Sequence, residues 1–130
     1  MNALQTLADQ LRAEDTPISP HVVDPVEPPE LGSLAGGGDY ALVVESVYEG
    51  YLCHYGEPRL LVGQDPDLAL LAGDYLYALG LDRLATLGDT GAVKVLADLI
   101  SECARLEAEG EREGISDLWR EAIKQIAPPR

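Results

Sequence analysis

The sequence predicts an all-α fold, an antiparallel helical bundle, and three observations lead to this prediction. Apolar residues recur every three or four positions in several segments of the 130-residue chain. Residues that typically begin or end helices flank most of these segments. No segment alternates apolar and polar residues over the length of a strand, so we expect no sheet.

The first part of the chain divides into a helix and an irregular segment. In residues 1–13, leucine recurs every three or four positions, which predicts a short amphipathic helix. Residues 14–38 contain five prolines and a run of three glycines, and proline cannot continue a regular helix. This composition predicts a linker or an extended strap. A simple tether is the favoured interpretation, and docking on a protein surface is the alternative.

Residues 39–127 are predicted to form the helical bundle domain. Its helices start at residues whose side chains can accept a hydrogen bond from the first turn, and several end at glycine or proline. Asp65 and Pro66 form a typical helix start, so we interpret Asp65 and Asp67 as helix-capping acids rather than metal ligands. The predicted helices are residues 39–55, residues 66–87, from Asp89 or Thr90 to about Gly110, and from Ser116 to Pro128.

The predicted helix at residues 66–87 is apolar around most of its circumference. Such a helix is buried on most sides, and a domain of this size has few neighbouring helices to cover it. We therefore expect a second polypeptide to cover the helix, which predicts an oligomer, and a Leu76→Asp change is expected to dissociate it. The residues expected at this interface are Leu68, Leu71, Tyr75, Leu76 and Leu79.

Charge and composition argue against several classes of partner. The chain carries 23 acidic and 9 basic residues, a net charge of −14, and an acidic surface repels nucleic acid and anionic membranes. No apolar run approaches the roughly 20 residues that a membrane span needs. The first residues lack the order of a signal peptide, so a cytoplasmic location is expected. Cys53 and Cys103 are predicted to be buried free thiols, with a disulfide as the alternative.

Three short motifs follow one another in the first half of the predicted bundle. They are Glu45-Ser46-Val47-Tyr48-Glu49, His54-Tyr55-Gly56-Glu57-Pro58 and Leu71-Ala72-Gly73-Asp74. Their order and spacing resemble trans-prenyl diphosphate synthases, in which D-D-x-x-D, R-R-G-x-P and L-A-G-D occur in that order. The resemblance covers residues 40–107 and implies part of the isoprenoid synthase fold.

The resemblance also implies which chemistry is absent. In the family, aspartates hold Mg²⁺ ions that neutralise a diphosphate leaving group, and arginines bind the second diphosphate. Here Glu45, Ser46 and Glu49 stand at the aspartate positions. His54 and Tyr55 stand at the arginine positions. Glu45 and Glu49 could hold one Mg²⁺ weakly, but a solvated helix face is the favoured interpretation of this pair. The family's second aspartate-rich motif is not reproduced near the C-terminus, and we expect no catalytic residue and no cofactor.

Three functions follow from these patterns. We favour a non-catalytic, prenyl-synthase-like subunit of isoprenoid biosynthesis that forms a homodimer or pairs with a catalytic prenyl diphosphate synthase. The small non-catalytic subunit of heterodimeric heptaprenyl diphosphate synthases is similar. One alternative is a helical protein-protein interaction module unrelated to isoprenoids, favoured if residues 40–55 do not pack alongside residues 66–87. The other is a weak Mg-dependent binder of allylic diphosphates that uses Glu45 and Glu49.

Overall fold

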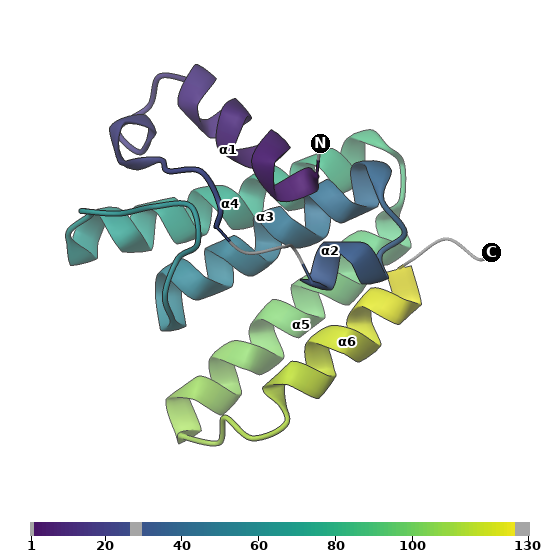
Figure 1. Cartoon of the computed structure of the whole chain (residues 1–130). Coiled ribbons are helices and arrows are strands. Elements are labelled where there is room, and N and C mark those ends of the chain that lie inside the picture. Colours follow the sequence, from purple (N-terminus) through teal and green to yellow (C-terminus); the bar gives the residue numbers. More distant parts are fainter. Residues whose placement is uncertain (1, 27–29, 127–130) are drawn as a thin grey trace.

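The described part of the chain folds into helices. The computed structural model describes residues 2–26 and 30–126, and Figure 1 shows them as a helical bundle. The predicted all-α fold is confirmed, and the bridged backbone pair among these residues joins Val22 to Leu61. None of the described helices is both long enough and apolar enough to cross a membrane. In chain order, the elements are α1 (Ala3–Ala13), the 3-10 helix η1 (Ser19–His21), α2 (Glu30–Leu34), α3 (Gly38–Tyr55), α4 (Pro66–Thr86), α5 (Thr90–Glu109) and α6 (Ile115–Ile126).

Local sequence signals set most ends of the long helices as predicted, but the start of α3 differs, because Gly37 precedes it without a side-chain cap where Asp39 was expected to cap the helix. Asp65 accepts a hydrogen bond from the N–H of Leu68 at 2.8 Å. Asp89 accepts one from the N–H of Ala92 at 3.0 Å, so each carboxylate caps a helix start. Gly110 ends α5 in the left-handed conformation, at φ 73°. The predicted end of α6 at the C-terminal prolines lies outside the described residues.

Helices α3 and α4 pack side by side (Figure 1), and small residues let their backbones approach closely. A Cβ atom on Gly50 would lie 2.8 Å from the carbonyl oxygen of Gly73, and a Cβ atom on Gly80 would come within 2.6 Å of an α3 side chain. The hydroxyl of Ser46 donates to the carbonyl oxygen of Leu76 at 2.8 Å. The two helices therefore pack against each other. The unrelated interaction module was favoured only if they did not.

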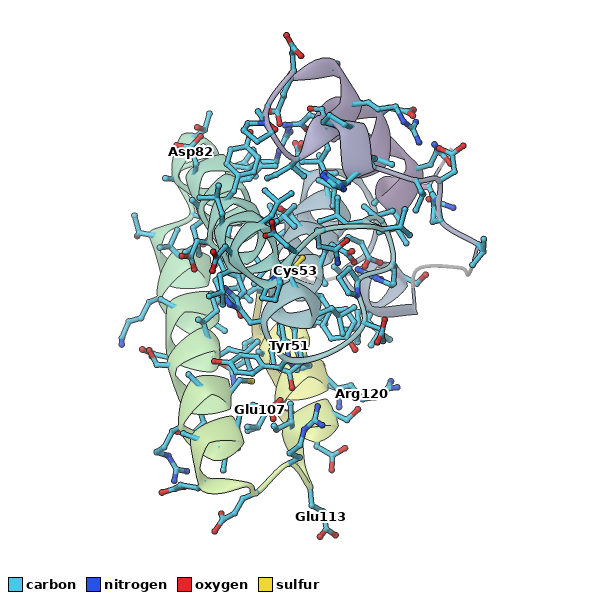
Figure 2. The ribbon with its side chains drawn as sticks, turned by 90° about the vertical axis from the view of Figure 1, so that its left-hand side faces the viewer. Tyr51, Cys53, Asp82, Glu107, Glu113 and Arg120 are labelled. Carbon is cyan, nitrogen blue, oxygen red and sulfur yellow. The ribbon has the colours of Figure 1, made fainter. Side chains whose placement is uncertain are left out.

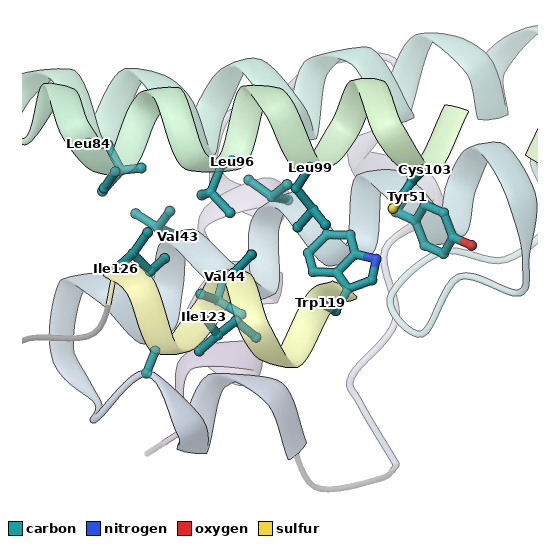
Figure 3. Packing of buried hydrophobic residues seen from close by; sticks show 14 of the residues in the cluster. Val43, Val44, Tyr51, Leu84, Leu96, Leu99, Cys103, Trp119, Ile123 and Ile126 are labelled. Carbon is teal, nitrogen blue, oxygen red and sulfur yellow. The ribbon is translucent and has the colours of Figure 1, made fainter. Parts of the chain in front are cut away.

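Two hydrophobic clusters hold the bundle together. The larger one fills the space between α3, α4, α5 and α6, as Figure 3 shows. Trp119 on α6 belongs to it, is 1% exposed, and lies edge-on to Tyr48 with ring centroids 5.0 Å apart. The second cluster joins α1 to α4 and to the loop after α3. Cys103 lies in the first cluster and Cys53 in the second, and both are buried free thiols, as predicted.

Part of the proline-rich segment packs against the bundle instead of forming a tether. Ile18 and Val22 are buried, at 3% and 9% exposure. The N–H of Val23 donates to the carbonyl oxygen of Leu60 at 2.7 Å. The tether interpretation is therefore wrong for residues 14–23, because the side chains of Ile18 and Val22 pack against a surface of the same chain. The short helix α2 was also not predicted.

Replacing Gly50 by alanine tests the close contact between α3 and α4. We expect Gly50→Ala to lower the free energy of unfolding by about 1–3 kcal/mol, because the added methyl group pushes against the α4 backbone. Urea unfolding followed by circular dichroism measures this change. Gly91→Ala is the control, since the nearest atom to a new methyl group there lies at 3.7 Å. Equal losses of stability in the two variants would contradict the close-contact explanation.

The two thiols should be unreactive in the folded chain. Burial raises the pKa of Cys53 to about 12, and the charge of Glu49 adds to this rise. Burial also raises the pKa of Cys103 to about 11. At pH 8 we expect an aromatic disulfide reagent to react only after urea unfolds the chain, because the thiolate is the reactive form. An unfolded thiol has a pKa of about 8.5. The stabilisation linked to both shifts is therefore complete below that pH and is lost as the pH rises through 11 to 12. Rapid labelling of the native protein at pH 8 would show that the two thiols are not buried.

Candidate functional site

The acidic pair of the first motif lies inside the protein. Glu45 and Glu49 occupy adjacent turns of α3, and each is 0% exposed. The expectation of a solvated helix face is therefore wrong. A buried carboxylate is tolerated only when it is paired and hydrogen-bonded, so the partners of these two residues define the site.

Arg59 supplies the positive charge that both carboxylates need. Its Nη1 donates to Oε1 of Glu45 at 2.8 Å, and its Nε donates to Oε1 of Glu49 at 2.9 Å. The loop after α3 turns back along that helix, which places one guanidinium against two acids that are one turn apart. The Arg59 side chain is 19% exposed, so the ion pairs are largely shielded from water.

Backbone N–H groups complete the set of partners. The N–H of Gly32, in α2, donates to Oε2 of Glu45 at 3.0 Å. The N–H groups of Arg59 and Leu60 donate to Oε2 of Glu49 at 2.7 Å and 2.9 Å. All four carboxylate oxygens therefore accept at least one hydrogen bond. These contacts also tie α2 and the loop after α3 to the middle of α3.

The electrostatic environment keeps Arg59 charged. Burial acts to lower the pKa of Arg59, but the negative charges of Glu49 and Glu45 outweigh burial, so the pKa lies above its ordinary value. The guanidinium carbon also lies 5.1 Å from the ring centroid of Tyr48, a cation–π geometry. We call Glu45, Arg59 and Glu49 the ion-pair cluster.

The ion-pair cluster does not fit a Mg²⁺ site. Mg²⁺ needs oxygen ligands in nearly octahedral geometry, whereas the oxygens of Glu45 and Glu49 face Arg59 and backbone N–H groups. Among residues 2–26 and 30–126, no group of three or more His, Cys, Asp or Glu side chains is placed to hold a metal ion. The chain's own guanidinium thus stands where the resemblance implied a metal ion.

The remaining motif positions make structural contacts. Nε2 of His54 lies 3.1 Å from Oδ1 of Asp74. The His54 ring occupies space that Gly73 leaves open, since a Cβ atom there would lie 2.5 Å from the ring. Tyr55 ends α3 at 36% exposure, and Ser46 bonds to the α4 backbone. The second and third motifs therefore meet each other at the contact between α3 and α4.

The residues expected at an interface fall into separate environments. Leu76 is 0% exposed and belongs to the second hydrophobic cluster, so it is a core residue of this chain, which corrects the expectation for it. Three others are half-buried against the same cluster: Leu68, Tyr75 and Leu79. Leu71 is 55% exposed and its neighbour Leu70 is 53% exposed.

Arg59 was not among the predicted site residues, although one sequence signal pointed to it. Residues 1–65 contain 11 acidic residues and two arginines, Arg12 and Arg59. A scarce cation that follows an acidic helix is a candidate partner for its carboxylates. The hydrogen bond from Gly32 had no comparable signal, because any backbone N–H can donate and only the fold brings this one near.

The fold is all-α, and its motif segment resembles that of prenyl diphosphate synthases in the order of its residues. A stretch of 80 residues, 62% of the chain, is 36% identical to "Heptaprenyl diphosphate synthase component 2" of Geobacillus stearothermophilus. This similarity confirms the predicted resemblance. The match covers 24% of that protein, so the chain corresponds to part of the relative's length. No family model matches the chain, and no solved structure matches it.

Removing the Arg59 guanidinium tests whether it holds the ion-pair cluster together. We expect Arg59→Met to lower the free energy of unfolding by about 3–5 kcal/mol, because two buried carboxylates lose their charged partner. Urea unfolding measures the change. Arg105→Met is the control, since Arg105 pairs with Glu102 and Glu109 on the surface, where an ion pair contributes little.

A triple variant separates loss of charge pairing from loss of packing. Arg59→Met combined with Glu45→Gln and Glu49→Gln should regain part of the lost stability, because no unpaired charge stays buried. If the triple variant is no more stable than Arg59→Met alone, unpaired charge is not the cause of the loss.

Proposed function

We propose that this chain is a non-catalytic, prenyl-synthase-related helical subunit that pairs with a catalytic prenyl diphosphate synthase or with a second copy of itself. The ion-pair cluster carries this proposal. It stands at the position of the family's first aspartate-rich motif, and its carboxylate oxygens are all engaged within the chain. Carboxylates engaged in this way are not free to hold the metal ions that ionisation of a diphosphate requires.

The surface of α4 supports pairing. Of the 21 residues in this helix, five are buried: Ala72, Gly73, Leu76, Gly80 and Leu84. On the opposite side, apolar residues at helical spacing are exposed or half-buried. We call these the α4 face: Leu70, Leu71, Ala78, Leu81 and Ala85. Exposed apolar side chains gathered on one face of a helix are typical of an interaction site, and on this face they surround the exposed Asp74.

The relative supports the kind of partner. Its name describes one component of a heptaprenyl diphosphate synthase. The chain matches part of such a protein, so we propose that a partner supplies the helices that cover the α4 face. Isoprenoid biosynthesis is the setting that this partner implies.

Leu71→Asp tests pairing through the α4 face. Leu71 is 55% exposed, so the folded monomer should keep its stability, whereas a partner would have to bury the new charge. We expect affinity to fall by at least about tenfold. Sedimentation measures self-association, and titration measures binding to a catalytic prenyl diphosphate synthase of the same organism. Leu34→Asp is the control, because Leu34 lies on α2 and is 46% exposed.

Two outcomes would contradict the proposal at different points. If Leu71→Asp pairs as well as the unchanged chain, the α4 face is not the interface. If the unchanged chain neither self-associates at micromolar concentration nor binds the synthase, the subunit role is wrong. A helical interaction module unrelated to isoprenoids is then the remaining interpretation. Leu76→Asp is unsuitable for this test, because Leu76 is buried within the chain.

A further inference from the structure

A second feature, separate from the α4 face, is a cavity of about 770 Å³ between α2, α3, α6 and the loop after α3. Small-molecule sites in proteins usually have volumes of about 300–1,000 Å³. The apolar part of the lining includes three aromatic and three aliphatic side chains. They are Leu31, Tyr48, Tyr51, Leu52, Ile115 and Trp119.

Basic side chains gather at the same cavity. Arg59, Arg112 and Arg120 line it, together with one acidic residue, Glu57. The whole chain has 9 lysines and arginines against 23 acidic residues, so a third of its permanent positive charges meet at one hollow. An apolar floor beside guanidinium groups fits an organic anion with an apolar body.

These arginines differ in how much charge they can offer a ligand. Arg59 is engaged in the ion-pair cluster. Nε of Arg112 lies 2.8 Å from Oε1 of Glu107, and Glu107 also accepts a 2.5 Å hydrogen bond from the hydroxyl of Tyr51 (Figure 2). Arg120 forms no ion pair with the described residues, and its side chain extends outward from α6 (Figure 2). Arg120 is therefore the arginine of this cavity whose charge is left for a ligand, and the negative charge of Glu57 in the same lining opposes a ligand that carries more than one negative charge.

The single positive charge of Arg120 determines which ligand head group fits the cavity. A phosphate or diphosphate carries more negative charge than Arg120 alone can offset, and the net charge of −14 repels it. A carboxylate carries one negative charge and matches the planar donors of a guanidinium. The positive end of the α6 dipole also lies at this cavity, since Ile115 and Ser116 line it.

We propose that this cavity binds a small monocarboxylate with an aliphatic or aromatic body. The carboxylate lies at Arg120, and the apolar body packs against Tyr48 and Trp119. This binding does not depend on the pairing proposed above, because the α4 face and the cavity have no residue in common.

The chain's single tryptophan makes this binding measurable. Trp119 lines the cavity, so titration with decanoate should change the tryptophan emission in a saturable way. We expect Arg120→Gln to weaken binding by at least about tenfold, because a charge-assisted hydrogen bond is lost. Arg105→Gln removes the same charge from α5, outside the cavity, and should leave the affinity unchanged. Leu71→Asp should also bind decanoate normally, which separates this test from the test of pairing.

Two further ligands identify the group that is recognised. Decanol and decyl phosphate should both bind more weakly than decanoate. Absence of saturable emission change and of calorimetric heat up to millimolar decanoate would overturn the proposal. Equal weakening by Arg120→Gln and Arg105→Gln would overturn it as well, since only the overall charge would then matter. Tighter binding of decyl phosphate would show that the preference for a carboxylate is wrong.

Discussion

Two buried carboxylates have to be neutralised inside this protein, and the arrangement of several elements depends on how that is done. An unpaired carboxylate in the interior costs several kcal/mol even after relaxation. Arg59 provides the charge for both Glu45 and Glu49, and Gly32 and Leu60 provide backbone donors. These same contacts position α2 and the loop after α3. Since that loop also pairs with the proline-rich segment, one cluster organises parts of the chain that are far apart in sequence.

Close packing on one side of α4 leaves its other side uncovered. Glycines let α4 approach α3 until backbone atoms nearly touch, and the largest buried side chain on this surface is leucine. A helix that packs so tightly on a narrow strip contacts its neighbours over less of its circumference. The apolar residues on the far side, including Leu71, then remain exposed. The chain thus covers α4 only in part, as expected from the sequence. Leu76, however, lies on the covered side.

The parts of the fold that depend on neighbouring residues could be predicted from the sequence. The caps at Asp65 and Asp89 act over three residues, so local spacing was sufficient to place two helix starts. The burial of Glu45 and Glu49 could not be predicted in this way. It depends on a guanidinium 10 and 14 residues away along the chain and on an N–H from α2. Composition likewise indicated a tether at residues 14–38, because composition alone does not reveal the surface that buries Ile18 and Val22.

Helix α3 divides its surface among three tasks. One face packs on α4 through Gly50. The next holds Glu45 and Glu49 against Arg59. Tyr48 contributes to the cavity and also lies beneath the Arg59 guanidinium. The glutamate side chains are long enough to reach a guanidinium that the chain itself supplies, so both carboxylates are paired within the fold. Of the three arginines that line the cavity, Arg120 has no ion pair among the described residues, and it lies on another helix.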